Sequence, residues 1–282
     1  MPTIAEKLET IAENEQKVYD KGWDDFLNLA TNNKTNFKYL FYESKIKEAP
    51  YIDMSKATSI DFMFANSSVT VIPEYNVPDN VGWRNTFYNC RNLTTVENQN
   101  IKGSSDSSYI FFDCKNLTNL NIEVIEARML SSSFSGCKSL KKLKKVIQRD
   151  YSQLSYTFYN CVSLHTIEEL EVHCNTSDFG VGIDDNTFYK CSALKNIKIT
   201  GELGKNCSFK YSAQLTSESL HSILRALKDY TGMSLSNGTS VEFYYTIYLS
   251  SESWAILDAE GAVSPNGNTW KEYLYDKKYN WA

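Results

Sequence analysis

The stretch "TFYNC" occurs at Thr86–Cys90 and returns letter for letter at Thr157–Cys161. Three near-copies share its spacing: "IFFDC" at 110–114, "SFSGC" at 133–137 and "TFYKC" at 187–191. A Cys that recurs three residues after a Phe can ligate a metal, form a disulfide or fill a core, and each role belongs to a different kind of protein. The extent of the pattern along the chain decides among these roles.

Seven units of this pattern follow one another. Successive Phe residues lie 23, 23, 24, 23, 24 and 30 positions apart, and each is followed three positions later by Ser or Cys and then by two apolar residues three apart. The first two units are one residue shorter between the Ser and the apolar pair, and the last contains the insertion "CNTSDFGVGID". This period is typical of leucine-rich repeats, in which each unit gives one short parallel strand and a return segment. The repeated residues are Phe41, Phe64, Phe87, Phe111, Phe134, Phe158 and Phe188, with Ser44, Ser67, Cys90, Cys114, Cys137, Cys161 and Cys191.

The recurring Cys is predicted to be a core residue. Ser44 and Ser67 replace it in the first two units, which a metal ligand or a disulfide partner would not tolerate. Zinc sites usually pair their Cys ligands in CxxC motifs, and the sequence has none. Seven Cys is an odd number, and the chain is long enough to fold without disulfides. We therefore expect reduced thiols stacked in a column inside a solenoid, beside an internal column of Phe rings.

The repeats predict an α/β solenoid of the leucine-rich repeat type with about seven units of 23–24 residues. Its parallel sheet should be about 29 Å long, because six intervals of ~4.8 Å separate seven strands. We expect a helical segment over residues 1–35, the solenoid over 36–205 and an α/β capping region over 206–282. Alternating apolar residues in "LTNLNIEV" (117–124) and "LKNIKIT" (194–200) favour strands there.

The N-terminal segment is predicted to be an attachment helix. Thr3, followed by Glu6 three residues later, forms a capping box. About 18 residues of helix are marginal alone in water, so the helix needs a partner. Three partners stay open: another protein of the same assembly, a second copy of the chain, or the first repeat. The apolar seam of the helix consists of Ile4, Leu8, Ile11 and Val18, with Glu15 as a polar interruption.

The capping region is predicted to contain a helix, a strand and a second helix. Thr216 is a good N-cap, with Leu215 and Leu220 placed for a hydrophobic staple and Gly232 as the stop. The alternating residues of "SVEFYYTIYL" (240–249) predict a strand, and a short helix should follow it directly. This region would cover the open strand edge at the end of the solenoid.

Composition and charge exclude two classes of partner. The net charge of -5 gives no general attraction for nucleic acid, which usually binds a basic face. No apolar run approaches the roughly 20 residues that span a bilayer. The first residues lack the basic and apolar parts of a secretory signal. We therefore expect a protein made in the cytoplasm, without membrane insertion and without nucleic acid as a partner.

No constellation of catalytic residues stands out. His165, His173 and His221 are scattered, and neither of the glycine motifs that bind phosphate, GxGxxG or GxxxxGK[ST], occurs. Asp184 and Asp185 fit a loop better than the carboxylate pair of a glycosidase. The chain is therefore predicted to be non-enzymatic, with no cofactor and no metal site.

Two surface patterns are candidates for binding. The residue after each Phe forms an aromatic column, interrupted by Ala65 and Ser135, which suits contact with protein or sugar if it is exposed and otherwise packs along the flank of the solenoid. The stretch "CKSLKKLKK" (137–145) crowds five lysines, which fit either an anion site or a solvated face. The aromatic candidates are Tyr42, Tyr88, Phe112, Tyr159 and Tyr189; the lysines are Lys138, Lys141, Lys142, Lys144 and Lys145, with Lys142 and Lys144 as candidate contacts.

The motif FxxCxxLxxI, over about residues 36–200, resembles the BspA-like leucine-rich repeats of bacterial surface antigens and of phage and prophage structural proteins. The N-terminal wording "TIAEKL..IAEN...VY..G" (3–22) is similar to the start of virion-associated proteins from phages of Gram-positive gut bacteria. The C-terminal helix, strand and helix resemble the cap of phage repeat proteins.

The resemblance implies a structural protein of the phage tail, baseplate or head surface. It would attach to other virion proteins through its helix and present its repeats to a host-surface protein or glycan. The alternative is a bacterial cell-surface adhesin.

Overall fold

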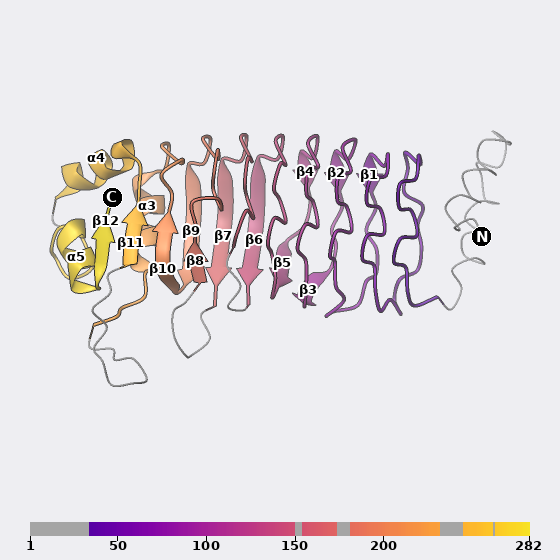
Figure 1. Cartoon of the computed structure of the whole chain (residues 1–282), viewed down its shortest axis with the longest axis horizontal. Helices are drawn as coiled ribbons and strands as arrows, with labels where there is room; N and C mark the ends of the chain where they lie inside the picture. The colour runs from indigo at the N-terminus through magenta and orange to yellow at the C-terminus, as the bar shows by residue number, and fades with distance from the viewer. Residues whose placement is uncertain (1–33, 150–153, 174–180, 232–244, 262) are drawn as a thin grey trace.

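The computed structural model describes residues 34–149, 154–173, 181–231, 245–261 and 263–282. The chain is an elongated solenoid whose rungs lie side by side from one end of the molecule to the other (Figure 1). The strand pairs of the described residues are all parallel. This arrangement fits the predicted repeat solenoid. The helix predicted near the N-terminus lies outside the described residues.

Each rung contains a six-residue turn built around its Phe. In the turn of Phe111, the amides of Phe112 and Cys114 donate to carbonyls three residues earlier, while the amide of Phe111 donates to the carbonyl of Ser133 in the next rung at 2.8 Å. The same alternation recurs along the solenoid, so turn amides bond alternately within the turn and to the next rung. The turns are therefore hydrogen-bonded to one another although they are not strands.

The seven Phe rings form one buried column, as predicted. Neighbouring rings stack with centroid distances from 5.1 to 5.8 Å, and no ring is more than 1% exposed. Phe209, beyond the predicted end of the solenoid at residue 205, adds an eighth ring 5.0 Å from Phe188. Because burying a Phe side chain contributes about 1.5–3 kcal/mol, this column is a main source of stability.

The other letters of "TFYNC" have structural tasks too. Thr157 donates its hydroxyl to the carbonyl of Leu130 in the preceding rung at 3.0 Å. Asn160 adopts the left-handed backbone conformation that closes the turn, with φ of 61°. The thiol of Cys161 donates to the carbonyl of Phe134 at 3.0 Å. The same contact, at 3.0 or 3.1 Å, is made by Cys90, Cys114, Cys137 and Cys191.

The repeated Cys is thus a core residue, as predicted. The six described Cys residues are free and buried. Burial raises the pKa of Cys90 and of Cys191 to about 12, so these thiols keep the proton that makes the rung-to-rung bond. Ser, which is small and also carries a donor, fits the same place at Ser67, where its hydroxyl contacts the thiol of Cys90.

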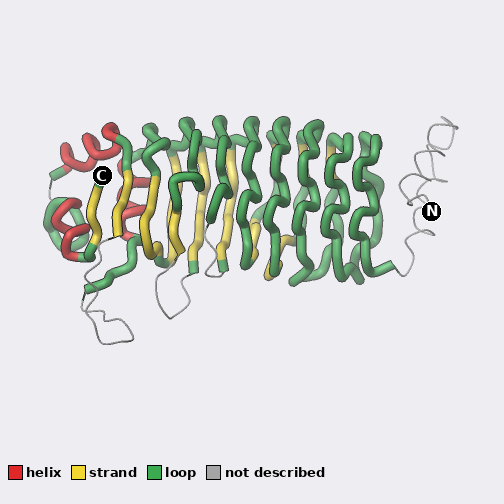
Figure 2. Tube along the Cα trace, in the orientation of Figure 1, coloured by secondary structure: helices red, strands yellow, loops and turns green. Residues whose placement is uncertain are grey.

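The strands fall into three parallel sheets, so the prediction of a single sheet is wrong. Figure 2 shows the strands in yellow and the turns and loops between them in green. The first sheet contains β1 (Val71–Ile72), β2 (Thr95–Val96) and β4 (Asn119–Leu120). The second contains β3 (Ile101–Ser104), β5 (Val124–Ala127), β6 (Lys142–Gln148), β7 (Thr166–Val172) and β9 (Asn196–Gly201). The third contains β8 (Val181–Ile183), β10 (Leu203–Ser208), β11 (Tyr245–Tyr248) and β12 (Tyr279–Trp281).

The sheets divide because strand length changes along the solenoid. In the rungs near the N-terminus, side chains make much of the bonding: Asn76 donates to Asp53, and the Gln99 side chain donates to the carbonyl of Pro73. Pro73 cannot donate to a ladder, and β1 ends before it after two residues. The later stretches "KLKKVIQ" and "TIEELEV" contain β-branched residues and form seven-residue strands.

Helix α3 (Ser217–Arg225) covers the edge of the second sheet. Its N-cap is Thr216, as predicted. The hydroxyls of Ser219 and Ser222 accept the amides of Ile197 and Ile199 in β9 at 2.9 and 2.7 Å. The helix thereby gives the edge strand hydrogen-bond partners in place of another strand.

Helix α3 ends earlier than predicted, at Arg225 rather than near Gly232, which itself lies outside the described residues. The amide of Leu203 donates to the carbonyl of Ala226 at 2.7 Å, and the amide of Lys228 donates back to Leu203 at 2.8 Å. Pairing with the start of β10 therefore takes the chain out of the helix.

Two further helices complete the capping region. Helix α4 (Ser251–Glu260) follows β11, as predicted, and its N-cap is Ser250. The part of the predicted strand before residue 245 lies outside the described residues. Helix α5 (Trp270–Asp276) and β12 are additional to the predicted elements. Thr269 and Glu272 form a capping box at the start of α5, so "TWKE" (269–272) was a signal for it.

Candidate binding surface

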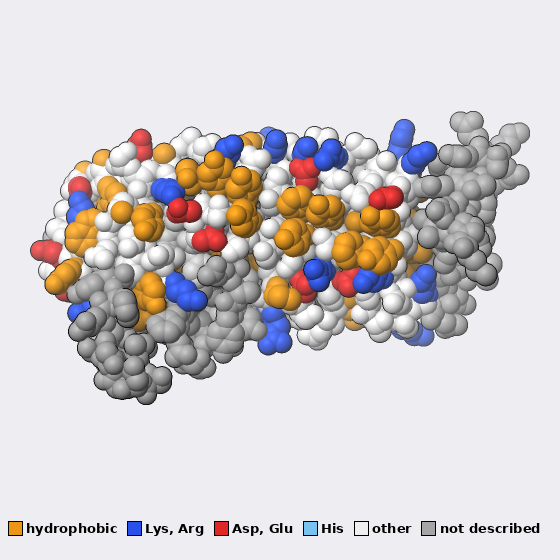
Figure 3. Space-filling view, viewed as in Figure 1, with side chains coloured by type: hydrophobic (Ala, Val, Ile, Leu, Met, Phe, Trp, Pro, Cys, Tyr) orange, Lys and Arg blue, Asp and Glu red, His pale blue; other side chains and the backbone are white. Residues whose placement is uncertain are grey.

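The turns present aromatic side chains at two outward positions, two residues before each Phe and one residue after it. Figure 3 shows hydrophobic side chains gathered in a band along one face of the molecule. We call the aromatic residues that flank the Phe column on the turn side the aromatic ridge. It consists of Tyr39, Tyr42, Phe62, Tyr88, Tyr109, Phe112, Tyr156, Tyr159 and Tyr189, extended by Tyr211 beside Phe209.

Ring contacts divide the aromatic ridge into three clusters, separated where a rung has small residues in place of aromatic ones. Tyr88 and Phe112 stack at a centroid distance of 5.0 Å with planes 6° apart, and Tyr159 and Tyr189 stack at 5.0 Å and 15°. The first cluster contains Tyr39, Tyr42 and Phe62; the second Tyr88, Tyr109 and Phe112; the third Tyr156, Tyr159, Tyr189 and Tyr211.

The rings of the ridge are only partly covered. Tyr39 and Tyr156 are 45% and 44% exposed, and Tyr42 and Tyr211 are each 37% exposed. The remaining rings are half-buried. Ring faces therefore pack on their neighbours along the solenoid, while edges and hydroxyls reach water. The aromatic column predicted after each Phe was expected either to be exposed or to pack along the flank of the solenoid. The structure shows part of each.

The structure brings the five predicted aromatics, Tyr42, Tyr88, Phe112, Tyr159 and Tyr189, into the ridge. Sequence reasoning missed the second aromatic position of the turn, which is occupied by Tyr39, Phe62, Tyr109 and Tyr156. The signal was present in the repeat alignment, because these four residues stand at one place, two positions before the Phe.

These four residues adopt left-handed backbone conformations, with φ of 60°, 56°, 59° and 57° in chain order. This conformation costs a residue that carries a Cβ roughly 1–2 kcal/mol. Asn85 fills the same place in another rung at φ 54°, and Asn tolerates this conformation better than an aromatic residue does. The fold therefore does not need an aromatic ring there, and the exposed rings are kept at a cost in stability.

Cationic side chains lie against the ridge. The ammonium groups of Lys38, Lys190 and Lys210 are 5.2, 5.4 and 5.2 Å from the ring centroids of Tyr39, Tyr189 and Tyr211. These distances are those of cation–π contacts. Tyr is among the residues that dominate binding energy in protein interfaces, whereas Lys is depleted there, so the rings are the stronger candidates for contact.

The predicted lysine cluster is largely neutralised. Lys142 forms an ion pair with Glu168, and Lys144 forms one with Glu123. Lys145 pairs with Glu169 and Glu171 on the neighbouring strand. These pairs favour the interpretation of the cluster as a solvated face of the sheet over an anion site.

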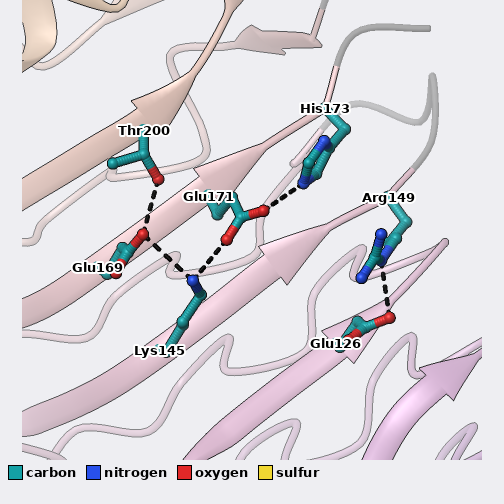
Figure 4. A network of polar contacts seen from close by, with 7 residues as sticks. All are labelled: Glu126, Lys145, Arg149, Glu169, Glu171, His173 and Thr200. Atoms are coloured by element: carbon teal, nitrogen blue, oxygen red, sulfur yellow. Dashed lines mark hydrogen bonds and ion pairs between the residues drawn. The ribbon is translucent and has the colours of Figure 1, made fainter.

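Lys145 is the centre of a network on the outer face of the second sheet (Figure 4). Its ammonium lies 3.2 Å from Glu169 and 2.5 Å from Glu171, and the pKa of Lys145 is raised, foremost by Glu171. Glu171 also bonds His173, and Glu169 accepts the hydroxyl of Thr200 at 2.9 Å. The carboxylates of Glu169 and Glu171 are thus bonded to residues of the same sheet, which indicates a structural role for the network.

The two carboxylates considered as a catalytic pair, Asp184 and Asp185, make structural contacts. Asp184 accepts the amides of Asn186 and Thr187 at the start of a turn, and Asp185 pairs with Lys210. Among the described residues, no group of three His, Cys, Asp or Glu side chains could hold a metal ion. Within the same part of the chain, no helix has the length and apolar character to cross a membrane.

Comparison with known families identifies the repeat. A family model described as "BspA type Leucine rich repeat region" matches the chain in six copies, over residues 61–180 and 154–254. The matched residues make up more than half of the chain. The match begins in the second turn and ends within α4, so it includes most of the ridge. No curated protein and no solved structure matches the chain significantly.

Proposed function

Because the chain belongs to the family of BspA-type leucine-rich repeat proteins, we propose that it is a non-enzymatic binding protein that contacts its partner through the aromatic ridge. The observation that carries this proposal is the set of aromatic rings at strained backbone positions, of which Tyr39 and Tyr156 are exposed and Phe62 and Tyr109 are half-buried. A solenoid stabilised only by its core would gain from Asn or Gly at these positions. Contact with a binding partner would explain why aromatic rings that lower the stability of the fold are retained at the surface.

The partner that fits the ridge best is a protein surface. A sugar ring packs against the open face of an aromatic side chain, but the faces of Tyr88, Phe112, Tyr159 and Tyr189 are stacked on one another. The edges and hydroxyls that remain, with the cations beside them, suit hydrogen bonds and packing in a protein interface. A host-surface glycan is the alternative ligand.

Binding can be tested with the triple variant Tyr39→Asn, Tyr109→Asn and Tyr156→Asn. Asn occupies the same place natively at Asn85, so the fold should be retained. Fluorescently labelled chain is titrated onto intact cells from a panel of Gram-positive bacteria, and the strain that binds the wild type best is used. Affinity of the variant should fall about hundredfold or more, because interface aromatics commonly contribute 2 kcal/mol or more each.

A matched control is the triple variant Thr118→Asn, Lys138→Asn and Ser192→Asn. These residues are exposed but follow the repeated Cys and do not flank the Phe. The control should bind like the wild type. Equal losses in both variants, or none in the ridge variant, would show that the ridge is not the contact surface.

We place this binding protein in a phage particle, at the tail, baseplate or head surface. The support is the resemblance of residues 3–22 to the start of virion-associated proteins. In this setting the N-terminal segment with Ile4, Leu8, Ile11 and Val18 attaches the chain to other virion proteins, and the ridge meets the host surface. The alternative is a bacterial cell-surface adhesin. The two differ in one observable: the protein sediments with purified particles in the first case and with cell envelopes in the second.

A further inference from the structure

A groove lies on the sheet side of the solenoid, away from the turns that carry the ridge. It runs between helix α3 and the outer face of β7 and β9 and has a volume of about 600 Å³. This volume is within the range of small-molecule sites. The lining comes from 166–168 in β7, 196–201 in β9 and one side of α3.

The accessible surface of the groove is mixed, with polar groups beside a somewhat larger apolar part. The side chains of Ile167, Ile197 and Ile199 point into the core, where no more than 5% of each is exposed. The polar groups that remain to meet a ligand are hydroxyls, an amide, carboxylates and cations. The polar side chains of the lining include Thr166, Asn196, Lys198, Glu218 and Arg225.

The groove has two chemically different ends. The two serine contacts that hold α3 against β9 make the helix and the strand run in the same direction. Glu218 therefore lies toward the Asn196 end, and Arg225 toward the Gly201 end. The register of β7 and β9 places Thr166 beside Asn196. One end thus offers an amide, a hydroxyl and a carboxylate, and the other end is cationic.

The cations of the groove are available to a ligand. Within the described residues, neither Lys198 nor Arg225 has a carboxylate within 4.0 Å, whereas Glu168 in the same groove is paired with Lys142. The nearby Glu169 is bonded to Thr200 and Lys145, and the charge of Lys198 also contributes to its lowered pKa from beyond ion-pair distance. Bringing a carboxylate to Lys198 and Arg225 breaks no ion pair of the folded chain.

We propose that this groove binds a sugar acid, a hydroxyl-rich ring that carries a carboxylate. The carboxylate lies between Lys198 and Arg225, and the Arg225 guanidinium can hold it with two parallel hydrogen bonds. The ring hydroxyls meet Thr166, Asn196 and Glu218, which supply both donors and acceptors. The site is separate from the aromatic ridge and gives the protein a second ligand of different chemistry.

Isothermal titration calorimetry of the full chain tests this proposal. The probes are glucuronic acid, N-acetylneuraminic acid, glucose and inorganic sulfate. At least one of the two acids should bind at least tenfold more tightly than glucose, which lacks the carboxylate, and than sulfate, which lacks the ring hydroxyls. Absence of binding by both acids, or equal binding of sulfate, would overturn the proposal.

Substitutions locate the site. Lys198→Gln and Arg225→Gln should each weaken binding of the acid about tenfold, or 1.4 kcal/mol. Lys138→Gln, an exposed change outside the groove, and the triple ridge variant should leave it unchanged. Thermal melting by circular dichroism checks that each variant folds. Binding that survives both groove substitutions would place the acid elsewhere and refute this assignment.

Discussion

The recurring Cys couples each rung to the one before it. Its side chain is small enough to lie beside the Phe column, and its thiol reaches the carbonyl of the preceding Phe at 3.0 or 3.1 Å. Burial raises the pKa of Cys90 to about 12, so the donor proton stays on sulfur at physiological pH. The same burial keeps these thiols from acting as nucleophiles, which need the thiolate.

Two glycines allow a direct test of how tightly neighbouring rungs approach. A Cβ on Gly201 would lie 1.9 Å from the carbonyl oxygen of Val172 in the adjacent strand, whereas a Cβ on Gly267 meets nothing within 4 Å. Both residues have positive φ, 85° and 80°. Gly267→Ala should therefore cost only the conformational strain of about 1–2 kcal/mol, and Gly201→Ala should cost clearly more. Urea unfolding midpoints measure the difference, and equal shifts would contradict the close packing of β7 against β9.

The repeat alignment was sufficient to predict the buried residues of a rung. Intervals of 23 or 24 residues, with one insertion before Phe188, keep Phe111, Phe134 and their counterparts in register, so their stacking follows from the repeat. The left-handed position two residues before the Phe could not be predicted in the same way. Gly or Asn would have signalled it, but Tyr39 and Tyr109 occupy it, and aromatic residues carry no such preference.

The capping region depends on contacts between its helices. The carboxylate of Glu260, the last residue of α4, accepts hydrogen bonds from Ser217 and from His221 in α3, the latter at 2.6 Å. The His221 ring lies 5.0 Å from that of Trp270, the first residue of α5. One carboxylate thus joins the start of α3 to the end of α4 and lies beside α5.

This contact predicts a loss of stability in acid. Burial alone would raise the pKa of Glu260, but the hydrogen bonds from Ser217 and His221 outweigh it, and the pKa is lowered. A lowered pKa in the folded state gives stability that is present above the unfolded value of about 4.3 and is lost as the pH falls through the folded value. Glu260→Gln should therefore lower the melting temperature at pH 7 and weaken its dependence on pH between about 5 and 3.

Glu48→Gln, an exposed change in the first rung, is the control for this measurement. It should leave both the melting temperature and its acid dependence close to those of the wild type. If Glu260→Gln melts with the same acid dependence as the wild type, the carboxylate does not join the helices as described.

The helices of the capping region could be predicted from the sequence, whereas the division of the strands into sheets could not. Helix α3 follows from the Thr216 cap and its apolar stripe, and α5 could have been found from its capping box. The division into three sheets was beyond prediction, because the two-residue strands near the N-terminus depend on side-chain bonds such as that of Gln99 to Pro73. Such bonds leave no periodic pattern.

The whole molecule has two long faces with different chemistry. The turn face carries the aromatic ridge, and the sheet face carries the ion-pair lattice around Lys145 and the polar groove beside α3. The family and the repeat pattern account for the solenoid, and they would be equally compatible with binding through either face. Our proposal that the partner binds the turn face rests on the strained aromatic residues there, of which Tyr39 and Tyr156 are exposed.

Hydroxyl-radical footprinting of the full chain, free in solution and bound to cells, tests this assignment most directly. Tyr39, Tyr109 and Tyr156 should be oxidised several-fold more slowly in the bound state, because the partner covers them. Tyr275 and Trp281, which are 58% and 39% exposed in the capping region, are internal controls and should be oxidised equally in both states. Protection of the two control residues with unchanged oxidation of the ridge tyrosines would contradict the account.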